Sequence, residues 1–385
     1  MKTETVAHPT DQTQRPCTLK DILGYALDRG ASDVHLKEMR PPAVRIDGVL
    51  EFTSLPETSH DEMIAFLGEL LSPQEVERFL AEGDADHAFS LPDLGRFRVN
   101  CYKQRGLVAI VLRHVKSQIP DFESLNLPTK AMEYIASLPR GLVLMTGTTS
   151  SGKSTTLAAI LDRINRTRDG HIVTLENPIE FLHTDKRCSV SQREIYIDTK
   201  DFKTGLRAVM REDPNVILIG EMRDVETFVT CMSAAETGHL VFSTLHTTNV
   251  MMTIDRILDF FPVDQHAQVR SQLALQMRAI ISQRLLPMAG GKGRVPAVEV
   301  LFNNPGIAQL IRDDEVEQIP TAIADGEEEG MQTFNMSLVG LVKRGLVIQE
   351  TAVWASDNPD ELKMNFQGIF LSRSRGGILK KAKHS

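Results

Sequence analysis

A glycine-rich loop between an apolar strand and a helix is the feature that most limits how this chain can fold. The loop follows the apolar run 142–146 and precedes a helical pattern over 153–165, and it has the spacing GxxxxGK[ST]. Glycines at these positions let backbone N–H groups curl around an anion at the amino end of a helix. The residues that we expect around phosphate are Gly147, Thr148, Thr149, Ser150, Ser151, Gly152, Lys153, Ser154 and Thr155. Lys153 would reach the terminal phosphates, and Ser154 would give an oxygen to magnesium.

Strands and helices alternate through the region that contains this loop. The expected strands are short, continuous apolar runs, as in sheets that are covered on both faces. In chain order the alternating segments are 142–146, 153–165, 172–175, 202–211, 216–219, 225–237 and 240–244. This alternation predicts right-handed crossovers and a mostly parallel sheet. Beyond Asn249 the pattern becomes mainly helical, chiefly over 264–286 and 331–344.

The first part of the chain has a different pattern, which predicts an α+β domain with a small antiparallel sheet. The expected helices are 19–27, 59–71 and 73–82, and the expected strands are 33–36, 43–52, 96–102 and 107–115. A polar, proline-bearing stretch then separates the two regions. A length of 385 residues suits two domains.

Composition excludes several classes of protein. The apolar fraction of 42% and the charged fraction of 24% are typical of a globular protein. A net charge of −8 gives no general attraction to nucleic acid, so we expect no nucleic-acid partner. The four cysteines, Cys17, Cys101, Cys188 and Cys231, form no CxxC pair that could bind zinc. Without a signal-like start or a run of eighteen apolar residues, the chain is expected to be cytoplasmic, without direct membrane insertion.

Two carboxylates follow expected strands at the edge where α/β sheets bind their ligands. Glu221 comes directly after the expected strand 215–220, at the position of a Walker B acid, and is a candidate ligand of magnesium. Glu180 lies in the loop after the strand 172–175, where a carboxylate could hold a water in line with the γ-phosphate. From its position alone, Glu180 could equally be a solvated loop acid.

Two histidines flank the strand 240–244. His239 precedes this strand and His246 follows it. An imidazole near the phosphates could report whether the γ-phosphate is present. Ordinary hydrogen-bonded histidines would explain the spacing as well, and no third ligand nearby supports a metal site.

Taken together, these segments resemble the secretion ATPase superfamily, and within it the type IV pilus retraction ATPases of the PilT and PilU kind. The motifs that carry the resemblance are Ala31–Leu36, Arg45–Gly48, Gly95–Asn100, the phosphate loop, Glu176–Glu180, Arg211–Pro214, Gly220–Asp224, Glu236–Leu240, Thr244–Asn249 and Gly330–Phe334. They extend over most of the chain. The resemblance implies an α/β fold, with an N-terminal α+β PAS-like domain followed by a RecA-like P-loop ATPase domain with a helical C-terminal part.

The resemblance also implies function. A protein of this kind is a homohexameric motor that hydrolyses ATP with Mg²⁺ and drives pilus retraction and twitching motility. It works at the inner face of the inner membrane through a platform protein, in some cases with a second retraction ATPase. The family pattern places the catalytic glutamate at Glu180, the Walker B glutamate at Glu221, and the histidine box at His239 and His246. Two arginines of the N-terminal domain, Arg98 and Arg113, would supply charge to the γ-phosphate.

The domain bounds that we expect are a disordered start over 1–17, a PAS-like domain over 18–116, a linker over 117–124, an ATPase domain over 125–355 and a tail over 356–385. The chain departs from the family pattern in two places. Asn177 stands where the acidic box usually has Asp, and Ala308 stands where a retraction-linked helix usually has Arg. These departures leave an accessory, PilU-like role open. An assembly or type II secretion ATPase is a further alternative, although the four-cysteine zinc insertion of those enzymes is not found in the sequence.

Overall fold

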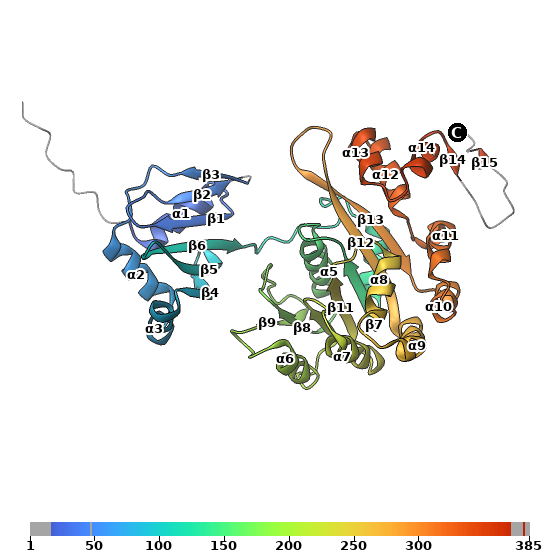
Figure 1. Cartoon of the computed structure of the whole chain (residues 1–385), viewed down its shortest axis with the longest axis horizontal. Helices are drawn as coiled ribbons and strands as arrows, with labels where there is room; N and C mark the ends of the chain where they lie inside the picture. Colours follow the sequence, from blue (N-terminus) through green and yellow to red (C-terminus); the bar gives the residue numbers. More distant parts are fainter. Residues whose placement is uncertain (1–16, 47, 371–379, 382–385) are drawn as a thin grey trace, which may run out of the picture. The chain divides into compact units, whose positions relative to one another are not determined.

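The computed structural model describes residues 17–46, 48–370 and 380–381, so the expected disordered start falls almost wholly outside the described residues. The chain forms two compact units, Met1–Ser117 and Gln118–Ser385, which are drawn in blue to teal and in green to red in Figure 1.

The first unit is an antiparallel sheet with three helices. Its strand order is β3-β2-β1-β6-β5-β4. The strands are β1 (Asp33–Lys37), β2 (Ala43–Ile46), β3 (Val49–Phe52), β4 (Asp84–Leu91), β5 (Gly95–Gln104) and β6 (Leu107–Val115). The helices are α1 (Leu19–Asp28), α2 (His60–Leu70) and α3 (Pro73–Glu82). Each helix begins at a capping box, with Thr18, Ser59 or Ser72 as the capping residue, which fixes where it starts.

The second unit is built on a seven-stranded sheet with the order β13-β12-β7-β11-β10-β8-β9. All neighbouring strands are parallel except β12 and β13, which form an antiparallel hairpin. The strands are β7 (Gly141–Thr146), β8 (Gly170–Glu176), β9 (Cys188–Glu194), β10 (Val216–Ile219), β11 (Leu240–Leu245), β12 (Met277–Pro287) and β13 (Arg294–Phe302). The strands β7, β10 and β11 are buried along their whole length, because helices cover both faces of the sheet.

Helices form a layer on each face of this sheet (Figure 1). The first of them are α4 (Thr129–Ser137), α5 (Lys153–Thr167), α6 (Phe202–Val209), α7 (Val225–Glu236), α8 (Val250–Leu258) and α9 (His266–Gln276). On one face α4 packs against α5, and on the other α7 contacts both α6 and α9. Right-handed crossovers require this division, because the chain crosses the sheet one way through α5 and returns the other way through α6, α7 and α8. Open α/β sheets bind their ligands where this direction reverses, at the carboxyl ends of the strands.

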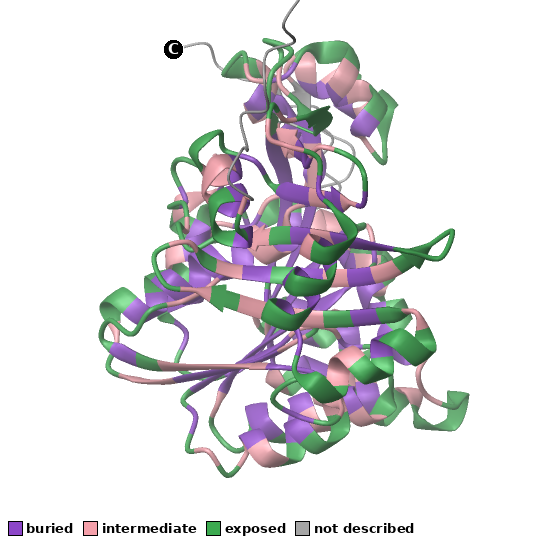
Figure 2. Ribbon diagram, turned by 90° about the vertical axis from the view of Figure 1, so that its left-hand side faces the viewer, coloured by how far each residue is buried: buried purple, intermediate pink, exposed green. Residues whose placement is uncertain are grey.

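The remaining elements follow the hairpin of β12 and β13. They are α10 (Pro305–Arg312), α11 (Ile319–Asp325), α12 (Phe334–Lys343), α13 (Gln349–Ala355), α14 (Pro359–Phe366), β14 (Ile369–Phe370) and β15 (Lys380–Lys381), with 3₁₀ turns at Val316–Gln318 and Glu327–Glu329; another 3₁₀ turn, Val263–Gln265, precedes α9. α10 packs against α9, and α10 and α11 belong to the core of the main sheet. A separate apolar core joins Leu286 and Val295 of the hairpin to α12, α13 and α14. In Figure 2 buried residues follow the strands and the inner sides of the helices.

The structure corrects the expectation of a helix over 264–286. The helix α9 ends at Gln276, and the residues that follow form β12. This segment has only short apolar runs, Ala279–Ile281 and Leu285–Leu286, with two adjacent β-branched residues, Ile280 and Ile281, and such short runs do not distinguish a buried strand from a buried helix. Pairing with β7 on one side and β13 on the other decides the outcome.

The boundaries also differ in detail from those expected. Residues 118–124, part of the expected linker, contribute Phe122 to the core of the second unit. Residues 359–366, in the expected tail, form α14, and its Leu362 is fully buried. Among the described residues, no helix combines the length and apolar composition that crossing a membrane requires.

Candidate nucleotide site

The phosphate loop joins the end of β7 to the start of α5, as the sequence predicts. Three of its residues, Gly147, Ser150 and Gly152, have positive φ angles of 145°, 63° and 89°. A Cβ on Gly147 would lie 2.4 Å from the carbonyl oxygen of Gln283, so the tight path of the loop excludes a side chain there. No side chain caps the amino end of α5, which leaves its first N–H groups free for an anion.

Lys153 lies inside this loop. Its Nζ donates to the carbonyl oxygens of Gly147 at 2.6 Å and Thr148 at 2.9 Å. Burial lowers the pKa of the Lys153 ammonium, although the charges of Glu221 and Glu180 act in the opposite direction. Both carboxylates are therefore electrostatically close to Lys153. The ammonium has no carboxylate partner within salt-bridge distance among the described residues, so its charge is available to a phosphate.

A buried glutamine on the neighbouring strand holds the loop in place. Nε2 of Gln283 donates to the carbonyl oxygen of Ser151 at 2.8 Å, and its Oε1 accepts from the hydroxyl of Thr156 at 2.8 Å. Gln283 is only 2% exposed. These two bonds link β12 to both ends of the turn that leads into α5.

Glu221 and His246 meet at the carboxyl edge of the sheet. β10 and β11 are parallel neighbours, and Glu221 and His246 follow their carboxyl ends. Nε2 of His246 lies 3.4 Å from Oε1 of Glu221, and NH2 of Arg223 lies 2.5 Å from its Oε2. The hydroxyl of Thr244 donates to the carbonyl oxygen of Gly220 at 2.6 Å, which locks the two strand ends together.

Glu180 lies at the same edge of the sheet, in the exposed loop after β8. The preceding carboxylate, Glu176, is anchored: its Oε1 accepts from the hydroxyl of Thr174 at 2.6 Å and from Nε2 of Gln192 at 3.2 Å. Burial raises the pKa of Glu176 to about 7, with the charge of Glu180 acting in the same direction. The backbone N–H of Glu180 also donates to this carboxylate. Glu176 thus fixes the backbone of Glu180, whose own side chain remains open to solvent.

The structure does not bring His239 to the phosphate loop of the same chain. This residue precedes β11 at the amino edge of the sheet, and six strand residues, roughly 20 Å, separate the two edges. Nδ1 of His239 lies 2.8 Å from the carbonyl oxygen of Ala234 and 3.1 Å from the hydroxyl of Thr237. It therefore ties the end of α7 to the start of β11.

Arg98 and Arg113 lie opposite each other on neighbouring strands of the first unit. Arg98 is exposed, whereas Nε of Arg113 donates to Oδ1 of the buried Asp33 at 2.6 Å. Burial alone would raise the pKa of Asp33, but hydrogen bonds from Ser32 and Arg113 and the charge of Arg113 lower it. Arg45 faces the same carboxylate from the other side, at 3.9 Å. Because these arginines belong to the first unit, their action on a nucleotide remains a prediction.

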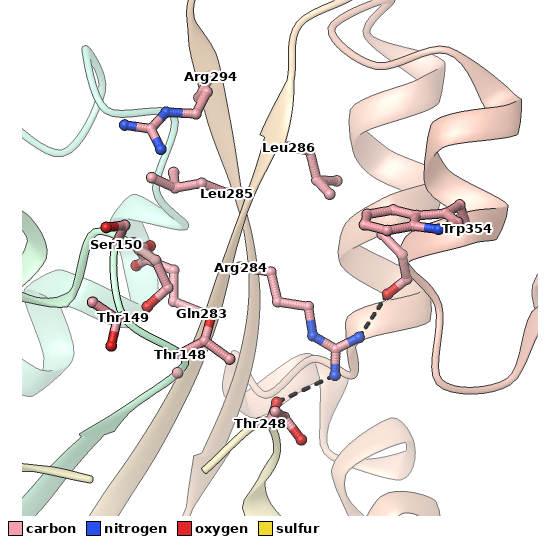
Figure 3. A pocket seen from close by; sticks show the side chains of 13 residues that line it. Thr148, Thr149, Ser150, Thr248, Gln283, Arg284, Leu285, Leu286, Arg294 and Trp354 are labelled. Carbon is pink, nitrogen blue, oxygen red and sulfur yellow. Dashed lines mark hydrogen bonds between the residues drawn. The ribbon is translucent and has the colours of Figure 1, made fainter. Parts of the chain in front are cut away.

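A pocket of about 420 Å³ opens beside the phosphate loop (Figure 3). Its walls are formed by Gly147, Thr148, Thr149, Ser150, Ser151, Thr248, Gln283, Arg284, Leu285, Leu286, Arg294, Trp354 and Ala355. Arg284 donates to the carbonyl oxygens of Ala355 at 2.6 Å and Thr248 at 3.2 Å, and its guanidinium lies 4.0 Å from the ring of Phe334. The volume is within the range of small-ligand sites.

The residues present fit magnesium held together with a phosphate. The described residues contain no cluster of three His, Cys, Asp or Glu side chains that could hold a metal by themselves. Magnesium usually keeps several waters and takes one or two protein ligands plus phosphate oxygens. Ser154 lies in the first turn of α5, and none of the hydrogen bonds found in the described part of the chain occupies its hydroxyl. Glu221 and Ser154 would then hold the ion, which would neutralise charge on the phosphates.

Sequence reasoning did not single out Gln283, Arg284 or Trp354. All three lie beyond Asn249, in the region whose pattern was interpreted as helical. The polar residues Ser282, Gln283 and Arg284 between the apolar pairs Ile280–Ile281 and Leu285–Leu286 were the available signal, because a buried polar group requires a partner. Only the pairing of β12 with β7 shows that this partner is the phosphate loop.

A parallel sheet with this loop between its strand and its helix, and with carboxylates at the same edge, defines a P-loop nucleotide-binding protein of the RecA-like α/β class. Within that class the chain belongs to the type II/IV secretion system protein family, whose family model matches residues 10–336.

Individual relatives are similar over almost their full length. The type IV pilus retraction ATPase PilT of Pseudomonas aeruginosa is 44% identical over 87% of this chain and 96% of its own. The type IV pilus ATPase PilU of the same organism is 38% identical over 89% of this chain and 90% of its own. A crystal structure of the pilus retraction motor PilT with bound ADP superposes with a TM-score of 0.83, at 45% identity over 90% of this chain and 99% of that one.

Proposed function

We propose that this chain is an ATP-hydrolysing motor that drives the retraction of type IV pili. The observation that carries the proposal is the arrangement around Lys153, where the phosphate loop and the two carboxylates Glu180 and Glu221 occupy one edge of the sheet. The relatives named as pilus retraction ATPases supply the class of work that the hydrolysis would power.

Each group has a distinct role in this proposal. Lys153 and the first N–H groups of α5 hold the phosphates, while Ser154 and Glu221 hold Mg²⁺. Glu180 orients the attacking water and accepts its proton, since its carboxylate is solvent-exposed and its backbone is fixed by Glu176. His246, beside Glu221, would respond to the charge on the γ-phosphate.

The motor would work as a homohexameric ring in the cytoplasm. An inner-membrane platform protein of the pilus would hold it at the inner face of the membrane. Arg98 and Arg113 would supply positive charge to the γ-phosphate, and rotation of the domains after hydrolysis would move the platform. The similarity to both PilT and PilU agrees with a second retraction ATPase as a partner.

A second candidate is an accessory retraction ATPase of the PilU kind. Two residues favour it. Asn177 removes one negative charge beside Glu176, and Ala308 stands at the position where the retraction-linked helix of the family pattern has an arginine. Ala308 is 9% exposed and faces the core, so in this chain α10 presents Gln309 and Arg312 to solvent instead.

The test is deletion of the gene, followed by complementation with the wild-type gene or with Glu180→Gln. We expect deletion to abolish twitching while surface pili are retained or increased, because assembly continues unopposed. The wild-type gene should restore motility and Glu180→Gln should not. Restoration of motility only when a companion retraction ATPase is present would identify the accessory role. Cells without pili after deletion would contradict both retraction roles and indicate an assembly ATPase.

A further inference from the structure

The chain contains a single tryptophan, and the structure leaves it almost fully exposed beside the phosphate loop. Trp354 is on α13 and is 82% exposed. An indole ring gains more from burial than most side chains, so an exposed one contributes little to folding. The tryptophan does, however, line the pocket that contains the phosphate loop.

The position of this side chain is set by the packing of its helix. Ala352 and Ala355, three residues apart, face the core formed with α12 and α14 and are 0% and 8% exposed. Trp354 lies off that buried face and lines the pocket. The next residue, Ala355, accepts a hydrogen bond from Arg284, whose guanidinium also reaches Asp357 at 2.5 Å. The backbone that carries the indole is therefore tied to β12.

The two ends of the pocket differ in chemistry. One end is the phosphate loop, with the backbone N–H groups and Lys153 that an anion requires. The other end has Leu286 and the indole of Trp354, the only aromatic side chain among the lining residues, whereas Leu285 lies beside Gly152 of the loop. Figure 3 shows Thr148, Thr149 and Ser150 on one side of Arg284 and Trp354 on the other. A nucleotide has the same polarity, with phosphates at one end and a flat base at the other.

We propose that Trp354 is the base-stacking residue of this pocket, and that its indole face covers the purine of a nucleotide whose phosphates lie in the loop. The inference rests on the proposed nucleotide site and adds the residue that recognises the nucleoside part. Stacking on an aromatic ring is tolerant of base identity. Trp354 therefore contributes affinity for any purine nucleotide, and adenine selectivity has to come from other groups.

Because the chain has one tryptophan, its own fluorescence reports on this contact. The experiment uses the purified full-length chain with two ligands, ADP and inorganic tripolyphosphate, and measures tryptophan emission together with affinity by calorimetry. ADP should change the emission of Trp354, whereas tripolyphosphate, which has no base, should bind without that change. Trp354→Ala should weaken ADP binding by about five- to 150-fold, the range for loss of one base stack. Its affinity for tripolyphosphate should stay within about twofold of wild type, because phosphate binding rests on the loop.

Trp354→Phe retains an aromatic face and should recover most of the ADP affinity. Ile348→Ala is the matched control, because Ile348 is an exposed apolar side chain directly before the same helix and does not line the pocket. If Trp354→Ala binds ADP as wild type does, or weakens ADP and tripolyphosphate equally, the stacking role is wrong. If Trp354→Ala alters only the assembly of subunits and not ADP binding, the stacking role is also wrong, and the exposed indole would serve a contact between proteins. If wild type binds neither ligand, the proposed nucleotide site itself is wrong. This outcome distinguishes a failure of the nucleotide site from a failure of the stacking role alone.

Discussion

The side-chain amide of Gln283 donates a hydrogen bond to the carbonyl oxygen of Ser151 at 2.8 Å, so the conformation of the phosphate loop depends on a strand more than 130 residues later in the sequence. The same glutamine accepts from Thr156 in the first turn of α5. The loop is therefore supported from both ends by one buried side chain.

Gln283→Ala should weaken nucleotide binding, although it removes no charged group. The effect would come through the shape of the phosphate loop, which Gln283 supports. The change leaves a buried carbonyl and a buried hydroxyl without partners, at about 1–3 kcal/mol each. We expect ADP affinity to fall by about tenfold and the thermal midpoint to fall as well. Calorimetry and thermal melting measure the two effects, with Gln318→Ala, at an exposed position, as the control. Unchanged ADP affinity would show that the loop holds its shape without Gln283.

Lys153→Ala should abolish nucleotide binding and leave the fold intact. The ammonium is buried, and that burial lowers its pKa, so removing the charge relieves an unfavourable desolvation. The loss of the group that neutralises the phosphates should therefore appear in ADP titration and not in the thermal midpoint. A variant that binds ADP with wild-type affinity would contradict the phosphate-loop interpretation.

Replacing Arg98 by Ala should affect ATP turnover alone, whereas replacing Arg113 by Ala should affect both turnover and stability. Arg98 is exposed, so Arg98→Ala should lower ATP turnover by about tenfold or more with an unchanged thermal midpoint. Arg113→Ala should lower turnover and also stability, because the buried Asp33 loses the donor at 2.6 Å and is left with Ser32 and the more distant Arg45 among the described residues. Arg78→Ala, an exposed arginine on α3, is the control. If neither variant alters turnover, the N-terminal unit supplies no charge to the γ-phosphate.

Glu299 should make the stability of the second unit depend on pH. Burial in β13 raises its pKa to about 7, although a hydrogen bond from the backbone N–H of Val250 opposes this. The folded state therefore binds a proton that the unfolded state releases at about pH 4.5, and the free energy of unfolding falls as pH rises from there to about 7. Glu299→Gln keeps the acceptor for Val250 and removes the titration. The stability of this variant relative to wild type should rise by about 1–3 kcal/mol between about pH 5 and pH 8.

The measurement for Glu299 is the thermal midpoint of both proteins at the two pH values. Glu317→Gln, at an exposed position, should show no pH-dependent difference from wild type. An equal offset between Glu299→Gln and wild type at both pH values would show that Glu299 titrates normally in the folded chain.

The sequence predicts those parts of the fold that depend on local patterns. The phosphate loop, the alternation over 142–244 and the three helices of the first unit are confirmed, because glycine spacing and apolar periodicity act over a few positions. The strands β12 and β13 were not predicted, because the length of an apolar run does not reveal its pairing partner. β4 and β9 were missed for a different reason: both are polar edge strands with few buried residues, so they have little apolar pattern to recognise.

The candidate site shows the same difference between residues that a local pattern predicts and residues that only long-range pairing brings to the site. Lys153, Glu221 and Glu180 were predicted because each stands next to a strand end, and parallel strands bring such ends together. Gln283 and Trp354 reach the pocket only through the hairpin and the core that packs on it. His239 shows the opposite case. It adjoins the same strand, β11, as His246, but the two histidines lie at opposite ends of that strand, so only His246 is at the edge of the sheet where the site lies.

Turnover of ATP by Glu180→Gln tests the central claim most directly. The variant keeps the shape of the side chain and the backbone N–H that bonds to Glu176, but it removes the base. With Mg²⁺ and saturating ATP, we predict a steady-state rate at least about a hundredfold below that of wild type, with unchanged affinity for ADP. Glu317→Gln, at an exposed position outside these motifs, should hydrolyse ATP as wild type does. A rate for Glu180→Gln within a few-fold of wild type would contradict the account and move the base to another group.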